Sequence, residues 1–284
     1  MSTSACRGRA RLAALLACLA FAGTAAGAQT LHVAVAANFA APMQALAQAF
    51  EAESGHSLSL STGSSGKLFA QIRSGAPFGV FFSADQAKPQ ALETLGRVVP
   101  GSRRTYAIGR LALWSREPGY LAGGPQRLRS GDFRRLALAN PRLAPYGAAA
   151  VEVLERLQLR AATEARWVRG ESIAQTWQFV STGSADLGFV ALAQIIDEGE
   201  IRSGSAWVVP AHLHAPIRQD AVLIDTSAAH PAAAALLDFV ASPQGQAIIR
   251  AFGYSVEGAA PDSVSHPASA PPAAGPAGAS NRSR

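Results

Sequence analysis

The sequence predicts an α/β protein with mixed, mostly parallel sheets that are flanked by helices. Short apolar runs that suit buried strands alternate with segments whose apolar residues recur every three or four positions, as on one face of a helix. Both ends of the chain lack this alternation, so the fold is expected to occupy residues 29–255. Alternation of this kind places helices on both faces of a sheet and ligands at the carboxyl ends of the strands.

Both ends of the chain are predicted to lie outside the fold. Three arginines precede a short apolar run over 12–23, and A-G-A then matches the small-residue pattern of a signal peptide (1–28) cleaved after Ala28. A lipidated Cys18 is the alternative, but apolar residues continue beyond that cysteine. At the other end, residues 256–284 are rich in Pro, Ala, Ser and Gly without apolar periodicity, which predicts a disordered tail.

Composition limits what the mature chain can do. Both cysteines, Cys6 and Cys18, lie in the signal, so the mature protein has no disulfide, no thiolate metal ligand and no cysteine nucleophile. The formal net charge of +6 includes the three arginines of the signal and falls to +3 without them. Basic and acidic residues are interleaved, so we expect no nucleic-acid partner. Export without disulfides indicates the periplasm.

The individual elements follow from their local patterns. The predicted strands are short runs rich in apolar residues, at 31–37, 58–62, 79–84, 105–115, 135–140, 186–192 and 217–225. The predicted helices carry their apolar residues on one face, at 39–54, 65–74, 147–158, 172–181, 231–240 and 243–251. The first helix is expected to end at Gly55, and the last to begin with Ser242 as cap and Pro243 in its first turn. Asp85 is expected to cap a further helix.

Residues 61–72, STGSSGKLFAQI, join a strand to a helix through two serines between glycines. The first N–H groups of such a helix lack backbone partners and point, with the positive end of the helix dipole, toward one place. One interpretation is an anion cradle; the other is an ordinary helix start at which Ser65 caps its own helix. Lys67 belongs to no phosphate-binding loop, because Ser61 and Leu68 break the required pattern.

Three more junctions of this kind favour the anion cradle. Together the four junctions open helices with small or neutral polar residues at 36–39, 63–66, 144–147 and 170–173. Their distribution over an early and a middle part of the chain predicts helix N-termini that converge across a cleft. Neutral donors there can hold a dianion and discriminate against a protonated oxyanion, whose hydroxyl would need an acceptor.

The same segments resemble the periplasmic molybdate-binding proteins of bacterial ABC transporters. The matching stretches extend in order over nearly all of 29–255; they are VAVAANF (33–39), GSSGKLFAQIRSGAPFGVFFSADQ (63–86), GSRRTYAIGRLALWS (101–115), ANPRLAPYGAAAVEVL (139–154) and GESIAQTWQFVSTGSADLGFVALAQI (170–195). The resemblance implies a class II periplasmic-binding fold, in which crossing strands near 106–112 and 217–224 join two lobes. Lobe 1 would then comprise 29–108 plus 221–255, and lobe 2 would comprise 109–220.

The resemblance also implies which residues hold the ligand. Carried over by position, the family's ligand-holding places fall on Asn38, Ser65, Tyr146 and Ile173. Ser65 matches a serine that gives its hydroxyl and its backbone N–H, whereas Tyr146 and Ile173 would give chiefly backbone N–H groups.

Three further positions are second-rank candidates. Ala37 stands where relatives that have an asparagine at the next position carry a threonine, and Ser64 precedes the matched serine. Ala191 stands where other relatives have a tyrosine hydroxyl, so the phenol of Tyr146 is a candidate for that role, and the alternative is that Tyr146 gives only its backbone N–H.

These observations lead to the hypothesis of a monomeric, non-catalytic receptor that captures molybdate, or tungstate as a near-equivalent, for an inner-membrane ABC permease. No cofactor is expected, and molybdenum would be present only as the bound oxyanion. A receptor for another small oxyanion, such as sulfate or thiosulfate, is the nearest alternative. A secreted hydrolase with Ser65 as its nucleophile is an alternative of another class, and it requires a histidine within hydrogen-bond reach of Ser65 Oγ.

Overall fold

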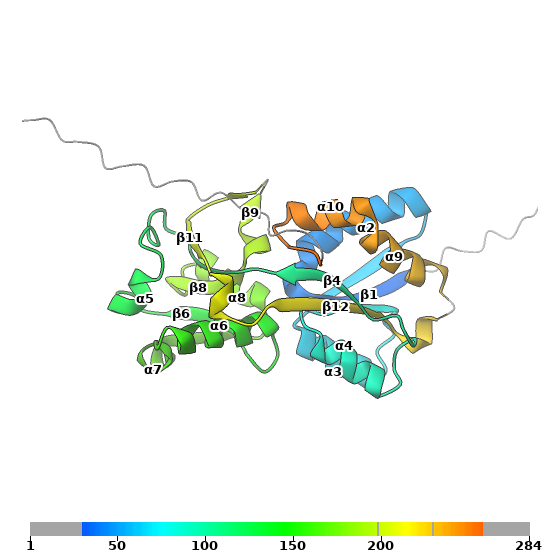
Figure 1. Cartoon of the computed structure of the whole chain (residues 1–284), viewed down its shortest axis with the longest axis horizontal. Helices are drawn as coiled ribbons and strands as arrows, with labels where there is room; N and C mark the ends of the chain where they lie inside the picture. The colour runs from blue at the N-terminus through cyan, green and yellow to red at the C-terminus, as the bar shows by residue number, and fades with distance from the viewer. Residues whose placement is uncertain (1–29, 198, 229, 258–284) are drawn as a thin grey trace, which may run out of the picture.

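The computed structural model describes residues 30–257 apart from 198 and 229, and it contains two lobes, each built around one five-stranded sheet (Figure 1). The predicted signal peptide lies outside the described residues, as does the tail from residue 258 onward. Val256 and Glu257 are described: Val256 packs against the core of the first lobe, and Glu257 accepts a hydrogen bond from Arg218. The described body therefore extends two residues beyond the predicted start of the tail.

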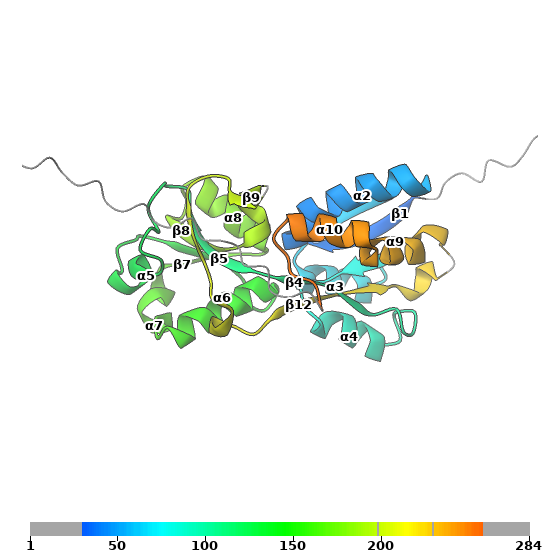
Figure 2. The same cartoon turned by 45° about the horizontal axis from the view of Figure 1, so that its top comes forward.

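The first lobe contains a sheet with the strand order β2-β1-β3-β12-β4. Its strands are β1 (Leu31–Ala36), β2 (Leu58–Gly63), β3 (Val80–Phe82), β4 (Arg104–Gly109) and β12 (Ile217–Leu223). Helices α2 (Ala40–Ser54), α9 (Pro231–Ala241) and α10 (Pro243–Ala251) cover one face, and α3 (Ser65–Arg73) and α4 (Ala87–Thr94) cover the other (Figure 2). Strand alternation explains the two layers, because Val33 and Val35 pack on the α2 side whereas Ala34 packs on the α3 side.

The second lobe repeats this plan with the strand order β11-β5-β8-β6-β7. Its strands are β5 (Leu111–Ser115), β6 (Leu136–Ala139), β7 (Trp167–Gly170), β8 (Leu187–Ala191) and β11 (Ser205–Val208). Helix α6 (Pro145–Arg156) covers the face that carries Leu136 and Leu138, and α8 (Ile173–Ser181) covers the face that carries Ala137. The shorter elements are α5 (Gln126–Ser130), α7 (Arg160–Thr163) and a hairpin of β9 (Ile196–Asp197) and β10 (Glu200–Ile201).

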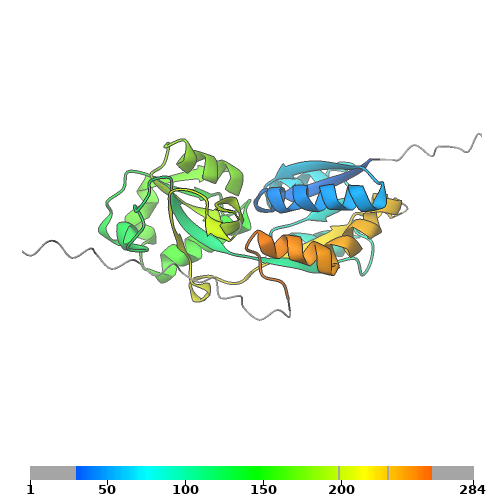
Figure 3. The ribbon, with the colours of Figure 1, turned by 90° about the horizontal axis from the view of Figure 1, so that it is seen from above.

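Two segments carry the chain between the lobes. The first passes from β4 to β5 through Arg110, and the second passes from β11 to β12. Strands β4 and β12 pair with each other and lie side by side at the junction (Figure 1), and Figure 3 shows the two lobes and the β4–β5 passage from above. The prediction of one continuous strand over 105–115 is therefore wrong. These residues form two strands that belong to two different sheets, because the chain changes lobe at Arg110.

The sheets are mixed, as predicted, but they have no parallel majority. Each sheet has two parallel and two antiparallel strand pairs. All four antiparallel pairs involve β12 or β5, the strands that directly follow the two lobe crossings. No crossover helix precedes these strands, and only parallel pairing requires such a crossover.

The predicted helices agree with the observed ones to within a few residues, and α2 ends before Gly55 as expected. Asp85 accepts a hydrogen bond from the backbone N–H of Lys88 at 3.1 Å in the first turn of α4, although Gln86 and not Asp85 is the N-cap residue of this helix. Strands β7 and β11 were not predicted; both are partly exposed edge strands of four residues. None of the described helices is long and apolar enough to cross a membrane.

Candidate functional site

The four junctions that the sequence predicts to hold an anion meet at one place between the lobes. The cavity at this place is lined by Ala36, Ala37, Asn38, Ser64, Ser65, Ala84, Ala144, Pro145, Tyr146 and Ile173. Asn38 and Ser65 belong to the first lobe, and Tyr146 and Ile173 belong to the second. The structure thus brings together all four first-rank candidates, together with Ala37 and Ser64. Ala191 is not among the lining residues, and its backbone N–H donates to Gln194 Oε1 at 3.0 Å.

Backbone N–H groups are the main donors available at this cavity. Helix α3 begins at Ser65, α8 begins at Ile173, and Tyr146 follows the first residue of α6, while Asn38 lies in the 3-10 turn Ala37–Phe39 that leads into α2. Among the described residues, the N–H groups of these four residues donate to no backbone carbonyl, as expected for the first turn of a helix. Four N–H groups at positive helix ends can therefore serve one guest.

The two serines of the second junction present their hydroxyl groups differently from an ordinary cap. Ser64, not Ser65, is the N-cap residue of α3, and no side-chain hydrogen bond caps this helix, so the capping interpretation of Ser65 is wrong. Ser65 Oγ instead accepts a hydrogen bond from the N–H of Ala84 at 2.9 Å, which leaves the hydroxyl proton to be donated elsewhere. Ser64 Oγ is buried and has no partner in the described structure. A buried polar atom without a partner at a cavity wall is a group that a ligand can satisfy.

The cavity wall is neutral. None of the ten lining residues carries a charged side chain, so positive potential comes from the helix ends and the N–H dipoles alone. The carboxylate of Asp85, next to Ala84, is occupied by the backbone N–H and the ammonium group of Lys88. The lining therefore supplies donors for a fully deprotonated anion and no carboxylate to accept a proton from an anion's hydroxyl group.

The polar side chains of Asn38 and Tyr146 face the lobe crossings. Asn38 Nδ2 donates to Gln219 Oε1 at 2.8 Å and to Tyr254 Oη at 3.0 Å, and Tyr106 Oη donates to Gln219 Oε1 at 2.9 Å. Gln219 Nε2 in turn donates to Tyr146 Oη at 3.3 Å. We call these five residues the hinge network. The phenol of Tyr146, one of the two groups by which this residue could serve an anion, is thus hydrogen bonded to a crossing strand.

Burial keeps the phenols of the hinge network neutral. Desolvation raises the pKa of Tyr106 and of Tyr146 well above the usual value, and it also raises the pKa of Tyr254.

The sequence analysis did not identify Gln219 as a residue next to the site. Its signal is the polar pair Gln219-Asp220 in the middle of a predicted strand that ends in an apolar run, since a buried polar residue must have partners.

The lobes are in direct contact beside the cavity. The N–H of Gly66, in the first turn of α3, donates to the carbonyl oxygen of Leu143 in the second lobe at 2.9 Å. Because the walls of the cavity come from both lobes, the width of the site depends on the relative position of the lobes.

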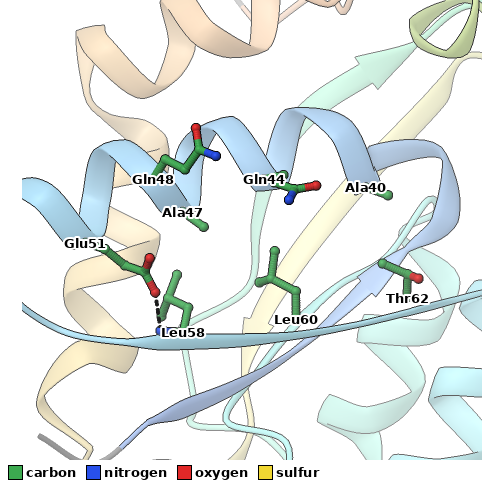
Figure 4. A pocket seen from close by; sticks show the side chains of 8 residues that line it. All are labelled: Ala40, Gln44, Ala47, Gln48, Glu51, Leu58, Leu60 and Thr62. Atoms are coloured by element: carbon green, nitrogen blue, oxygen red, sulfur yellow. Dashed lines mark hydrogen bonds between the residues drawn. The ribbon is translucent and has the colours of Figure 1, made fainter.

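A second, larger groove lies on the first lobe between α2 and the edge strand β2 (Figure 4). Its volume is about 600 Å³, and its lining includes Gln44, Gln48 and Glu51 of α2 and Leu58 and Leu60 of β2. The Glu51 carboxylate accepts a hydrogen bond from the N–H of Leu58 at 2.6 Å. This groove has no converging helix N-termini, and its one charge is negative, so it is poorly suited to an anion.

Two chemical alternatives can be compared with the geometry. A serine hydrolase would need a histidine at Ser65 Oγ, but in the described part of the chain this atom's partner is the backbone N–H of Ala84, and no histidine lines the cavity. Residues 30–257, apart from 198 and 229, contain no cluster of three or more His, Cys, Asp or Glu side chains that could hold a metal ion.

Comparison with known proteins places this geometry in context. Residues 31–255 match the family model described as bacterial extracellular solute-binding protein. The chain is 49% identical over 245 residues to the molybdate-binding protein ModA of Azotobacter vinelandii, covering 86% of this chain and 95% of that protein. It is 43% identical over 232 residues to ModA of Rhodobacter capsulatus, covering 82% and 90% of the two chains. The solved structure of the periplasmic molybdate-binding protein of A. vinelandii superimposes with a TM-score of 0.77 at 42% identity, covering 80% of this chain and 99% of that one.

Proposed function

The chain belongs to the ModA molybdate-binding proteins, within the bacterial extracellular solute-binding proteins, and we propose that its four converging junctions hold the anion. It is the periplasmic molybdate-binding component of an ABC transporter. The observation that carries the site assignment is the meeting of Asn38, Ser65, Tyr146 and Ile173 at one neutral cavity between the lobes.

The donor set of this cavity supports a preference for a tetrahedral dianion. At neutral pH molybdate, tungstate and sulfate carry two charges and no proton, whereas phosphate is partly protonated. A P–OH group would find no acceptor carboxylate in the lining and would leave a buried donor unpaired. Tungstate is expected to bind nearly as well as molybdate, because the two anions share shape and charge.

Sulfate can be rejected only by its size. Its tetrahedron is smaller, so donors held on two lobes cannot all reach its oxygens at hydrogen-bonding distance. Ser65 and Asn38 lie on one lobe, and Tyr146 and Ile173 lie on the other. The separation of the lobes therefore determines the size of the tetrahedral anion that all four donors can contact at once. Closure of the lobes around the dianion is the conformational signal that a permease would read.

Thermal unfolding with each anion at equal concentration and fixed ionic strength tests the assignment. A ligand present at about a thousand times its dissociation constant stabilises the folded state by about 4 kcal/mol. For a body of this size that corresponds to a rise in Tm on the order of 10 °C. We expect this rise with molybdate and tungstate and none with sulfate or phosphate. If sulfate matched molybdate, the ligand assignment would fail while the receptor function survived; if no oxyanion raised the Tm, the receptor function itself would be refuted.

Export and oligomeric state complete the proposal. We propose cleavage after Ala28, on the pattern of the basic, apolar and small-residue segments that precede it, and mass spectrometry of the exported protein should find Gln29 at the N-terminus. A lipidated Cys18 would contradict this expectation.

We further propose that the protein is a monomer, which delivers its anion to an inner-membrane permease without catalysing a reaction. Light scattering with and without molybdate tests whether the protein is monomeric.

A further inference from the structure

Gln219 occupies an unusual position for an amide side chain. It lies on β12, the strand that enters the first lobe from the second, and it has no solvent exposure. Its register partner on β4 is Ala107, and the pairing of β12 with β4 shifts directly after it, between Gln219 and Asp220. Its amide is therefore enclosed at the point where both crossing strands lie side by side.

The amide of Gln219 links the walls of the anion cavity to each other. Its Oε1 accepts from Asn38 Nδ2 at 2.8 Å on the side of the first lobe, and its Nε2 donates to Tyr146 Oη at 3.3 Å on the side of the second lobe. Tyr106 Oη lies 2.9 Å from the same Oε1 and 3.0 Å from the carbonyl oxygen of Ser83, so its one proton has two acceptors within hydrogen-bonding distance. Asn38 and Tyr146 both line the anion cavity.

The phenol of Tyr146 contacts both crossing strands. Besides Gln219 on β12, it lies against Gly109, the last residue of β4, where an added Cβ atom would come within 2.0 Å of Tyr146 Oη. Since Tyr146 belongs to the first turn of α6 in the second lobe, a change in lobe separation would move its hydroxyl relative to Gln219. The Gln219–Tyr146 hydrogen bond is thus a contact that depends on the closed arrangement.

We propose that Gln219 is a positioning residue for anion binding, which ties the first-lobe and second-lobe walls of the cavity to the hinge strand without touching the anion. The inference rests on the proposed function, because it assumes that the cavity is where the anion binds. If Gln219 has this role, part of the affinity for the anion comes from the hydrogen bond between Gln219 and Tyr146, which forms at the hinge when the lobes close. The hydroxyl of Tyr146 then acts through Gln219, and only the backbone N–H of Tyr146 faces the anion.

A double-mutant cycle of Gln219→Met and Tyr146→Phe tests this role. Methionine keeps the length of the side chain and removes its polar atoms, and phenylalanine removes only the hydroxyl group. Tyr146→Phe should weaken molybdate binding about tenfold in titration calorimetry, the effect of losing one buried hydrogen bond. Gln219→Met should weaken it at least as much, because it also removes the contacts of the amide with Asn38 and Tyr106. The double variant should match Gln219→Met within about twofold, because Gln219→Met already removes the contact that Tyr146→Phe removes. If Gln219→Met does not fold, Gln219→Asn replaces it in the cycle, since it withdraws the amide from Tyr146 by one methylene group.

Thr163→Val serves as the control for a purely structural effect. Thr163 is also fully buried and hydrogen bonded, with Oγ1 donating to the carbonyl of Leu159 at 2.8 Å, but it lies on α7, away from the hinge network. This variant should lower the Tm of the ligand-free protein and leave molybdate affinity unchanged. An equal loss of affinity in Thr163→Val would overturn the inference, because loss of stability alone would then explain the effect of Gln219→Met.

The remaining outcomes separate this inference from the proposed function. Wild-type affinity in Gln219→Met, or losses that multiply in the double variant, would overturn the positioning role; the latter would show that the phenol contacts the anion independently. A wild-type protein that binds no oxyanion would instead refute the proposed function. If the wild type binds an oxyanion other than molybdate, the cycle is measured with that anion and keeps its meaning.

Discussion

A methyl group added at Gly66 would enter the contact between the lobes. Gly66 lies in the first turn of α3, and a Cβ atom there would come within 3.0 Å of both the Cα and the carbonyl oxygen of Leu143 and within 3.3 Å of its Cδ2. Two of these atoms belong to the backbone of the opposite lobe and cannot turn away as a side chain would. Gly66→Ala should therefore push Leu143 back and lengthen the 2.9 Å hydrogen bond from the N–H of Gly66 to its carbonyl.

The substitution is expected to have opposite effects on stability and on binding. Alanine favours the helical conformation of α3 over glycine by at most about 1 kcal/mol, and this gain is available whether or not the lobes touch. The closed arrangement loses about 1–2 kcal/mol from overpacking and from the weakened hydrogen bond. Binding of an anion that requires closure should therefore weaken roughly five- to thirtyfold, while the ligand-free protein keeps or slightly raises its Tm.

Titration calorimetry with molybdate and thermal unfolding without it measure the two effects separately. Ala70→Gly is the matched control, because it makes the reverse change at an exposed position of the same helix. It should lower the Tm of the ligand-free protein and leave the affinity unchanged. Wild-type affinity in Gly66→Ala would refute the reasoning, since the contact between Gly66 and Leu143 could not then be part of the anion-bound form.

Three further predictions follow from the site and the hinge network. Ser65→Ala should weaken molybdate binding by about 1–3 kcal/mol, and Ser65→Asp should abolish it by placing a carboxylate against a dianion; calorimetry measures both, and an unchanged affinity in the aspartate variant would place the site elsewhere. Gly109→Ala should displace the phenol of Tyr146, for which a Cβ atom leaves no space, and weaken binding at least as much as Tyr146→Phe; a variant with wild-type affinity would contradict this. Because burial raises the folded-state pKa of Tyr106, Tyr146 and Tyr254, the unfolded chain loses these protons first, and the stability they contribute is present below pH 10 and falls above it. Urea unfolding at pH 9, 10 and 11 should show a decline of up to about 1.4 kcal/mol per pH unit for each phenol, reduced in Tyr106→Phe; a flat profile would contradict it.

Local sequence was sufficient to predict the helix starts that meet at the candidate site. A small or neutral polar residue at the start of a helix determines, within a few positions, that the first N–H groups have no backbone partner. The positions of Ser65 and Ile173 at the first residues of α3 and α8 are set in this way by the residues around them. The alternation of strands and helices likewise determined the layered architecture, because periodicity shows which side of each element is buried.

The same local reasoning failed where the chain passes between the lobes. The run over 105–115 was predicted as one strand although Gly109-Arg110 interrupts it, since a buried residue is apolar whichever sheet surrounds it and both sides of the interruption are apolar. Only the pairing partners distinguish β4 from β5, and those partners come from distant parts of the chain: β12 for one and β8 and β11 for the other. Edge strands such as β7 were missed for the related reason that their partial exposure removes the apolar signal.

The use of each polar side chain at the site was decided by the tertiary structure alone. Ser65 Oγ finds its partner 19 residues away in Ala84, and the Tyr146 hydroxyl finds its partner 73 residues away in Gln219. A hydroxyl group accepts whichever buried donor the fold brings within about 3 Å, and no local pattern specifies a donor at such a separation. The sequence by itself therefore determined the helix starts that can hold an anion, whereas the packing of the two lobes decided which side chains face the cavity and which face the hinge.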